Sequence, residues 1–215
     1  MKKLFNKIEM KPLFISVSLV IFQTILFFLA KIFQSNFHTI GNIIDKNIPF
    51  NNIAIIPYCF WYFLIFFVPY YLYLKDKNTL CKYIGSYILC VIISNIIFIV
   101  YPSMVIRPDI KPDNILNFIT WFIYKIDDPA INCLPSLHCA VAMLFSLSSF
   151  DSHKLSIRYK TLITIFSIII MISTLVIKQH VFIDLVVGDI FMTICYLIMK
   201  NNDYFISRIK KLLKI

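Results

Sequence analysis

Two histidines and an aspartate near the ends of apolar segments are the residues of this sequence best suited to chemistry. His180 and Asp184 are four residues apart, a spacing that places two helical side chains on one face, with Cβ atoms about 5 to 6 Å apart. A carboxylate that accepts a proton from one imidazole nitrogen leaves the other nitrogen free as a nucleophile or base. The same spacing also fits a hydrogen bond that only joins two helices.

A second polar group lies at the start of another apolar segment. Pro135 and Ser136 suit the first turn of a helix, where unpaired N–H groups and the positive end of the helix dipole can hold an anion. His138 follows within one turn, and in its protonated form it can give a proton to a departing oxygen. The simpler interpretation is that Ser136 caps the helix beside an interfacial histidine.

Two cations and a further acid complete the set of candidate residues. Arg107 carries a planar guanidinium that matches phosphate oxygens, and Lys178 precedes His180 by two residues. Both also fit interfacial side chains that extend to lipid headgroups. Asp189 lies deeper in an apolar segment, where a carboxylate costs about 2.5 to 3.5 kcal/mol, and the sequence assigns it no role.

The composition predicts that these candidate residues are carried by membrane-spanning helices. Of 215 residues, 60% are hydrophobic and 15% are charged, which excludes an ordinary soluble domain, a disordered chain and a disulfide-stapled secreted module. Roughly 20 helical residues cross a bilayer, and the first apolar run is too long for the core of a signal peptide. The sequence therefore predicts one all-α membrane domain over 1–215, with six spans near 12–30, 53–74, 83–101, 134–150, 161–177 and 181–199.

Basic residues are distributed unequally between the two sides of this predicted bundle. The net charge is +10, and 15 of the 21 Lys and Arg residues fall on the side that carries the termini. Cytoplasmic loops carry such an excess, so both termini are expected in the cytoplasm and the histidines at the outer face. The basic tail 208–214 is then expected on anionic lipid, and nucleic acid is not an expected partner.

Two long connections, 31–52 and 102–133, are expected at the outer face. Within the second, Asp113 can cap a short helix over 114–126, whose Trp121 and Phe122 suit the headgroup zone. This helix is either a lid that lies flat on the membrane or an apolar segment packed over the bundle. The six cysteines form no CxxC motif, and those within the spans are expected to pack as small apolar residues.

Together, the three polar motifs resemble the signature of the type 2 phosphatidic acid phosphatase superfamily. That signature reads K-x6-R-P, P-S-G-H and S-R-x5-H-x3-D, and the matching residues are Arg107-Pro108, Pro135-Ser136-Leu137-His138, and Ser173 with His180 and Asp184. Val100, Leu137 and Thr174 stand where the signature has lysine, glycine and arginine. In their particular residues, the motifs are similar to those of the branch that contains inositol phosphorylceramide synthase and sphingomyelin synthase relatives.

The resemblance implies a membrane lipid phosphatase that works through a phosphohistidine. His180 would be the nucleophile, Asp184 its orienting partner and His138 the acid for the leaving lipid oxygen. Arg107, Ser136 and Lys178 would bind the phosphate, and the scheme needs no metal or other cofactor. The partner is a lipid phosphate in the membrane, and short loops favour a bacterial plasma membrane with the site facing the periplasm or exterior. The oligomeric state is not indicated.

The residues leave three other functions open. A phosphotransferase would pass the phosphorylated headgroup to another hydroxyl, a difference that depends on whether the pocket excludes water. A zinc centre would use His138, His180 and Asp184 as ligands, although Arg107 would repel the cation. A non-enzymatic lipid transporter would use the His/Asp pair as a proton relay.

Overall fold

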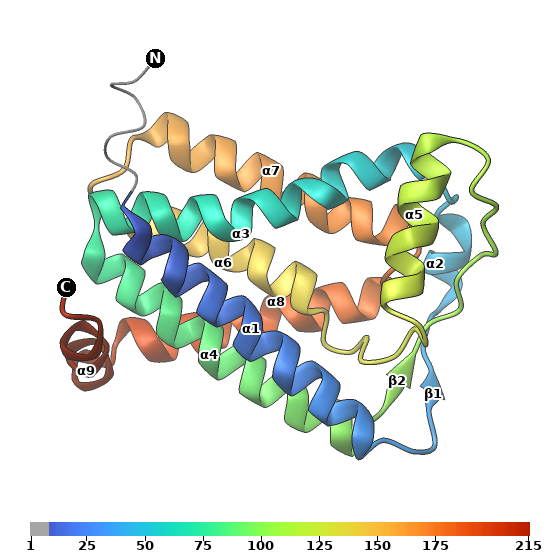
Figure 1. Ribbon diagram of the computed structural model, residues 1–215, viewed down its shortest axis with the longest axis horizontal. Helices are drawn as coiled ribbons and strands as arrows, with labels where there is room; N and C mark the ends of the chain where they lie inside the picture. The colour runs from blue at the N-terminus through green and yellow to red at the C-terminus, as the bar shows by residue number, and fades with distance from the viewer. Residues whose placement is uncertain (1–8) are drawn as a thin grey trace.

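The computed structural model describes residues 9–215 and shows a bundle of six helices with shorter elements at its two ends (Figure 1). The bundle consists of α1 (Met10–Ile32), α3 (Ile55–Lys75), α4 (Lys77–Val100), α6 (Leu137–Asp151), α7 (Ile157–Val176) and α8 (Phe182–Lys200). Within the described residues, five of these helices are long and apolar enough to cross a membrane, whereas α6 has 15 residues and falls below that length. The chain is thus a mostly helical membrane protein with five candidate spans.

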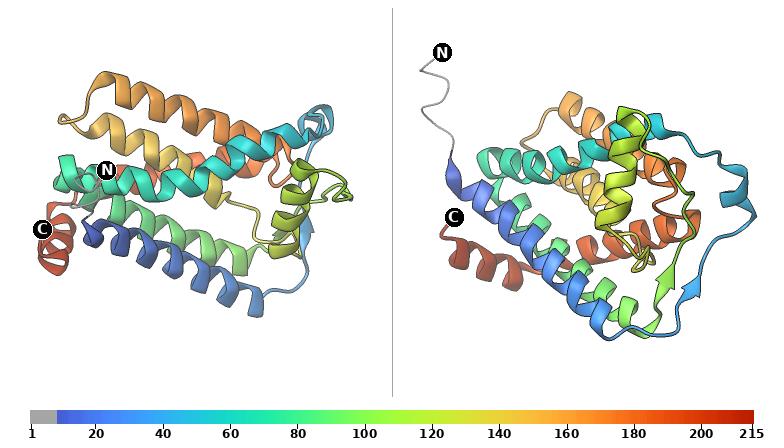
Figure 2. Two further views of the ribbon diagram at one scale, coloured as in Figure 1. Left: turned by 45° about the horizontal axis from the view of Figure 1, so that its top comes forward. Right: turned by 45° about the vertical axis from the view of Figure 1, so that its right-hand side comes forward.

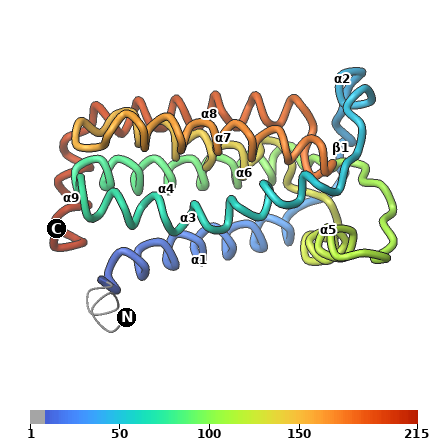
Figure 3. The backbone as a smooth tube through the Cα atoms, turned by 90° about the horizontal axis from the view of Figure 1, so that it is seen from above, coloured from blue at the N-terminus to red at the C-terminus, as the bar shows by residue number. Residues whose placement is uncertain are grey.

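The shorter elements separate the two ends of the bundle. Figure 3 shows α9 (Asp203–Leu213) lying across one end, which we call the α9 end, and the remaining short elements gathered at the other, which we call the loop end. These are β1 (His38–Thr39), α2 (Ile43–Asn47), the 3-10 helix η1 (Asn52–Ala54), β2 (Ser103–Met104) and α5 (Ile115–Ile126). The two strands pair in parallel, with His38 opposite Ser103, so the connections that follow α1 and α4 are joined at the loop end.

Helix α6 occupies the centre of the bundle. It packs against α3, α4, α7 and α8, while α1 lies along α4 in both views of Figure 2. Small residues of α6, such as Ala140 and Ala142, are fully buried and permit this close approach. Its first turn is capped in line with the simpler interpretation of Ser136, because the Ser136 hydroxyl accepts a hydrogen bond from the Cys139 N–H at 3.2 Å.

The start of α6 is joined directly to α8. The Ser136 N–H donates to the Asp184 carbonyl at 3.0 Å. Gly188, one turn further along α8, is buried against the same residue, and a Cβ atom there would lie 2.5 Å from the Ser136 carbonyl oxygen. A side chain at position 188 would therefore push the start of α6 away from α8.

Capping residues shift several helix starts from their predicted positions. Helix α4 begins at Lys77, earlier than the predicted residue 83, because the Asp76 carboxylate caps it by accepting from the Thr79 N–H. Helix α5 exists as predicted, but its cap is the Asn114 side chain, which accepts from the Asn117 N–H. Asp113 instead accepts from the Asn117 side-chain amide at 2.6 Å. All six cysteines are free, and most are buried.

Charged residues at the α9 end join several helices. Asp151 of α6 accepts from Lys82 of α4 at 2.6 Å and from Lys200 of α8 at 2.5 Å. Ser152 donates to Asp76 at 2.8 Å and so ties the connection after α6 to the one after α3. Burial tends to raise the pKa of Asp76, but hydrogen bonds from Ser152 and Thr79 outweigh it and lower the pKa below its ordinary value.

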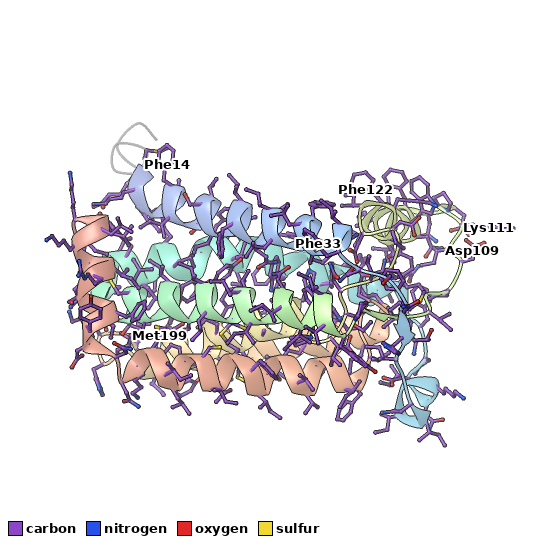
Figure 4. All side chains as sticks on the ribbon, turned by 90° about the horizontal axis from the view of Figure 1, so that it is seen from below. Phe14, Phe33, Asp109, Lys111, Phe122 and Met199 are labelled. Carbon is purple, nitrogen blue, oxygen red and sulfur yellow. The ribbon has the colours of Figure 1, made fainter. Side chains whose placement is uncertain are left out.

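The outer surface of the bundle is apolar. Phe14 and Phe33, near opposite ends of α1, are 66% and 67% exposed, and Figure 4 shows both at the surface. In the same view, Phe122 projects from α5 at the loop end, and the charged residues Asp109 and Lys111 lie on the loop at that end. Contiguous exposed apolar side chains of this kind are expected to face lipid, since water would oppose their exposure.

The contact at Gly188 predicts that the substitution Gly188→Ala destabilises the protein. The added methyl meets backbone atoms of Ser136, and overpacking of this kind costs about 1 to 3 kcal/mol. We expect a lower unfolding temperature for the purified protein in detergent.

Gly85→Ala is the matched control, because a Cβ atom there meets the flexible end of the Met199 side chain. Its helix gains about 1 kcal/mol from the loss of glycine, which offsets the cost of moving Met199. An equal loss of stability in both variants would contradict the proposed rigid contact between α6 and α8.

Candidate active site

His180 and Asp184 form the hydrogen-bonded pair that their spacing predicts. Nδ1 of His180 lies 2.8 Å from Oδ2 of Asp184, at the first turn of α8. The Asp184 side chain is fully buried and also accepts from the Val181 N–H at 3.2 Å. A carboxylate so placed keeps the proton of His180 on Nδ1. Nε2 of His180 makes no hydrogen bond to any part of the chain that the structure describes, so its lone pair is available.

His138 lies beside this pair although it comes from a different helix. The centroids of the His138 and His180 rings are 5.7 Å apart. Two residues of α3 hold His138: Tyr58, whose hydroxyl is 3.0 Å from Nε2, and Trp61, whose indole N–H donates to the backbone carbonyl of His138 at 3.1 Å. Each histidine is thus held by its own set of contacts, and the two rings lie next to each other between α3, α6 and α8.

Both imidazole rings open onto one cavity of about 260 Å³. Its walls are mainly apolar and aromatic, and they come from α1, α3, α5 and the segment that leads into α6. The ionisable or strongly polar side chains among the lining residues are Gln23, Thr24, Tyr58, Tyr62, Arg107, Asp127, Asn132, Cys133, His138, Gln179 and His180. A small group of polar atoms in an apolar pocket is the usual form of a ligand site.

Arg107 reaches this cavity from the connection between α4 and α5. Its guanidinium donates to the Asp127 carboxylate at 2.6 Å and lies over the Tyr124 ring, 4.9 Å from the centroid. Nε of Arg107 is buried and has no hydrogen-bond partner in residues 9–215. The guanidinium is therefore fixed in place, with donor capacity that a ligand anion can use.

Ser136 and Lys178, the two other predicted phosphate ligands, make different contacts. The Ser136 side chain is fully buried, and its hydroxyl serves as the cap of α6. Nζ of Lys178 donates to the backbone carbonyls of Asp45, at 2.7 Å, and Ile48. Neither residue lines the cavity. In this structure Lys178 joins the α7–α8 turn to the segment around α2, and Arg107 is the cation that lines the cavity with the two histidines.

The predicted metal ligands do not converge on one point. The Asp184 carboxylate is directed to His180, while Nε2 of His138 is directed to Tyr58. Over residues 9–215, no group of three or more His, Cys, Asp or Glu side chains is arranged to hold a metal ion.

Most residues that line the cavity were not identified from the sequence as site residues, and four of these contact or adjoin the histidines or Arg107. They are Tyr58, Trp61, Asp127 and Gln179. Gln179 is adjacent to His180, which is a local signal, whereas Tyr58 is 80 residues from the histidine that it contacts. Nothing in the local pattern of an aromatic-rich helix distinguishes a tyrosine that faces a histidine from one that faces lipid.

Fold and site together define a helical membrane protein whose cavity contains two histidines and an arginine. The family model of the PAP2 superfamily matches residues 30–198, which include all three sequence motifs, and the chain belongs to this superfamily. The match concerns the superfamily and not a branch within it. No curated protein and no solved structure gave a significant match. Membership of the PAP2 superfamily supports a phosphatase-type function on phosphate esters.

The ion pair between Arg107 and Asp127 predicts competition between Asp127 and a bound phosphate. Replacement of Asp127 by asparagine removes the competing charge, so inorganic phosphate should bind more tightly, by roughly two- to fivefold for a partly exposed ion pair. The inhibition constant of inorganic phosphate in a turnover assay measures this change.

Asp128→Asn is the control, because Asp128 is an exposed neighbour that forms no salt bridge within the described chain. Weaker phosphate inhibition in the Asp127 variant would instead show that this carboxylate is needed to hold Arg107 in position.

Proposed function

We propose that this protein is a membrane lipid phosphatase that hydrolyses the phosphate ester of a lipid through a phosphohistidine at the outer membrane face. The observation that carries the proposal is the hydrogen bond from Nδ1 of His180 to buried Asp184, which leaves Nε2 without a partner among residues 9–215, at an apolar cavity shared with His138. Phosphoryl transfer requires mainly an in-line nucleophile and stabilisation of charge.

The proposed reaction has two steps. Nε2 of His180 forms a bond to phosphorus while the bond to the lipid oxygen breaks, and the electron pair of that bond stays on the oxygen. A proton from His138 converts this oxygen to an alcohol. Water then gives a proton to His138 as its oxygen bonds to phosphorus, and the electron pair of the broken N–P bond returns to Nε2. The products are a lipid alcohol and inorganic phosphate.

Arg107 and the first turn of α6 are the proposed phosphate ligands. Arg107 lines the same cavity as the histidines, and Leu137 and His138, which also line it, belong to the first turn of α6 at the positive end of the helix dipole. Ser136 contributes by capping this turn. Lys178 contributes by holding the outer segment through its contacts to Asp45 and Ile48, which it would have to leave to reach the phosphate.

The shape of the cavity supports a lipid substrate. Its lining residues follow α1 from Phe28 to Val20, which spans about 12 Å at 1.5 Å per residue, and face Ile65 and Phe66 of α3. An apolar slot that runs from the histidines into the membrane-spanning part of the bundle suits an acyl or prenyl chain whose phosphate lies at the imidazoles.

We also propose a single domain of six spans with both termini in the cytoplasm. Helix α6 is the sixth span. Its 15 residues cover about 22 Å, and the segment 127–136 connects it to the short elements of the loop end. The start of α1 and the end of α9 lie at the same end of the bundle (Figure 1). Because α9 carries Arg208, Lys210 and Lys211 there, the rule for basic loops places this end inside the cell and the cavity towards the periplasm or exterior of a bacterial plasma membrane.

The catalytic assignment predicts different losses for three substitutions. His180→Ala and His138→Ala should each abolish detectable turnover of lipid phosphates, because they remove the nucleophile and the acid. Asp184→Asn should lower turnover by at least about tenfold, because the amide no longer holds the reactive tautomer. The measurement is phosphate release from a panel of labelled lipid phosphates, with Lys210→Ala as a control at the opposite end. Full activity in His180→Ala would contradict the assignment of His180 as the nucleophile.

The products of the same assay separate two reactions. Free phosphate supports hydrolysis, whereas a new labelled phospholipid supports transfer of the phosphorylated headgroup to another hydroxyl. A label that is retained on His180 in wild-type protein and absent from His180→Ala supports the covalent step in either case.

The slot between α1 and α3 predicts that chain length can be altered by one substitution. Val20→Trp fills the inner end of the cavity, so the variant should prefer shorter chains while it turns over short-chain substrates normally. Ile21→Trp is the control, because Ile21 is 51% exposed and does not line the cavity. The readout is KM across a series of alkyl phosphates. If Val20→Trp keeps the chain-length preference of the wild type, the alkyl chain of the substrate does not bind in this slot.

A further inference from the structure

The hydroxyl group of Tyr58 connects His138 to a second buried polar side chain. Tyr58 is 1% exposed, and its oxygen lies 3.0 Å from Nε2 of His138 and 3.3 Å from Nε2 of Gln179. Gln179 is itself 3% exposed and immediately precedes His180. Three side chains from α3, α6 and the α7–α8 turn thus form one short hydrogen-bonded row.

One hydrogen-bond acceptor in this row of side chains has no donor. Oε1 of Gln179 is buried and has no hydrogen-bond partner among the residues that the structure describes. A buried amide oxygen without a partner is destabilising, so an arrangement that gives it a donor is favoured. Rotation of the terminal amide by half a turn brings this oxygen to Tyr58.

Two arrangements of the protons follow from this geometry. With the Gln179 NH₂ group donating to Tyr58, the tyrosine proton is directed to Nε2 of His138, and the proton of the neutral imidazole resides on Nδ1. With the amide rotated, Tyr58 donates to Oε1 of Gln179, and its oxygen is free to accept a proton from Nε2 of His138. The second arrangement suits a protonated His138, which has an N–H group at both nitrogens.

We propose that Tyr58, backed by Gln179, is a positioning residue that keeps a proton on Nε2 of His138, so that Nδ1 delivers the proton to the leaving lipid oxygen. This inference rests on the proposed function. During P–O cleavage the Nδ1 proton moves to the lipid oxygen, the Nε2 proton stays in its hydrogen bond to Tyr58, and the imidazole becomes neutral. Water returns a proton to Nδ1 when the phosphohistidine is hydrolysed.

The two histidines of the site are then held in opposite tautomers. Asp184 keeps a proton on Nδ1 of His180 and exposes Nε2 as the nucleophile. Tyr58 keeps a proton on Nε2 of His138 and exposes Nδ1 as the acid. A neutral hydroxyl suits the second task, because a carboxylate so close to His138 would compete with the phosphate for Arg107 and the imidazolium.

The test compares leaving groups, because a proton donor matters most when the departing oxygen is a poor leaving group. The substrates are a long-chain alkyl phosphate and a nitrophenyl phosphate that carries the same chain. For the alkyl phosphate, kcat of Tyr58→Phe should fall by roughly 10- to 100-fold with little change in KM. For the nitrophenyl phosphate, whose oxygen departs without a proton, kcat should change less than about threefold.

Gln179→Leu is the second variant and should show the same dependence on the leaving group with a smaller amplitude. Tyr83→Phe is the matched control, because the Tyr83 hydroxyl is also buried but has no partner within residues 9–215. That variant should treat both substrates as the wild type does.

The outcomes distinguish this inference from the proposed function. If His138→Ala discriminates between the substrates but Tyr58→Phe and Gln179→Leu slow both equally, the two residues only support packing and the inference is overturned. If the wild type cleaves neither substrate, or if His138→Ala slows both to the same extent, the acid role of His138 fails and the inference fails with it.

Discussion

The buried carboxylate of Asp184 is the group on which the geometry of the site depends. A charge without solvent must be compensated by hydrogen bonds, and Asp184 obtains them from the His180 ring and the Val181 backbone. Its own carbonyl accepts from the Ser136 N–H, so the residue that orients one histidine also anchors the helix that carries the other. The glycine at position 188 permits this contact, because the backbones of α6 and α8 meet where a Cβ atom would collide.

The membrane explains why ionisable side chains are few and why those at the cavity have neighbouring partners. Five helices of the described chain are apolar enough to span a bilayer, and an ionisable side chain between them is costly unless it has partners. Arg107 has Asp127, and His138 has Tyr58. The same apolar surroundings would strengthen every interaction with a phosphate group, since charges interact more strongly in a medium of low dielectric constant.

The two ends of the bundle serve different purposes. At the α9 end, Asp151 links Lys82 and Lys200 and thereby holds α4, α6 and α8 together away from the cavity. At the loop end, the paired strands and the contact from Lys178 to the segment around α2 hold irregular chain over the start of α8. The cavity is lined both by helices α1 and α3 of the bundle and by residues of these connections, among them Arg107 and Asp127.

Features that depend on near neighbours along the chain could be predicted from the sequence. These are the apolar helices, the cap at Ser136, the short helix that ends at Ile126, and the pairing of His180 with Asp184, because helical geometry alone brings residues four apart together. The superfamily signature further grouped Arg107 with the histidines. Partners that lie far apart in the chain became known only from the folded structure: Tyr58 for His138, Asp127 for Arg107, and the backbone carbonyls of the α2 segment for Lys178. Such contacts depend on how whole helices rotate and pack against each other, and apolar spans with nearly uniform composition carry little signal of which face turns inward.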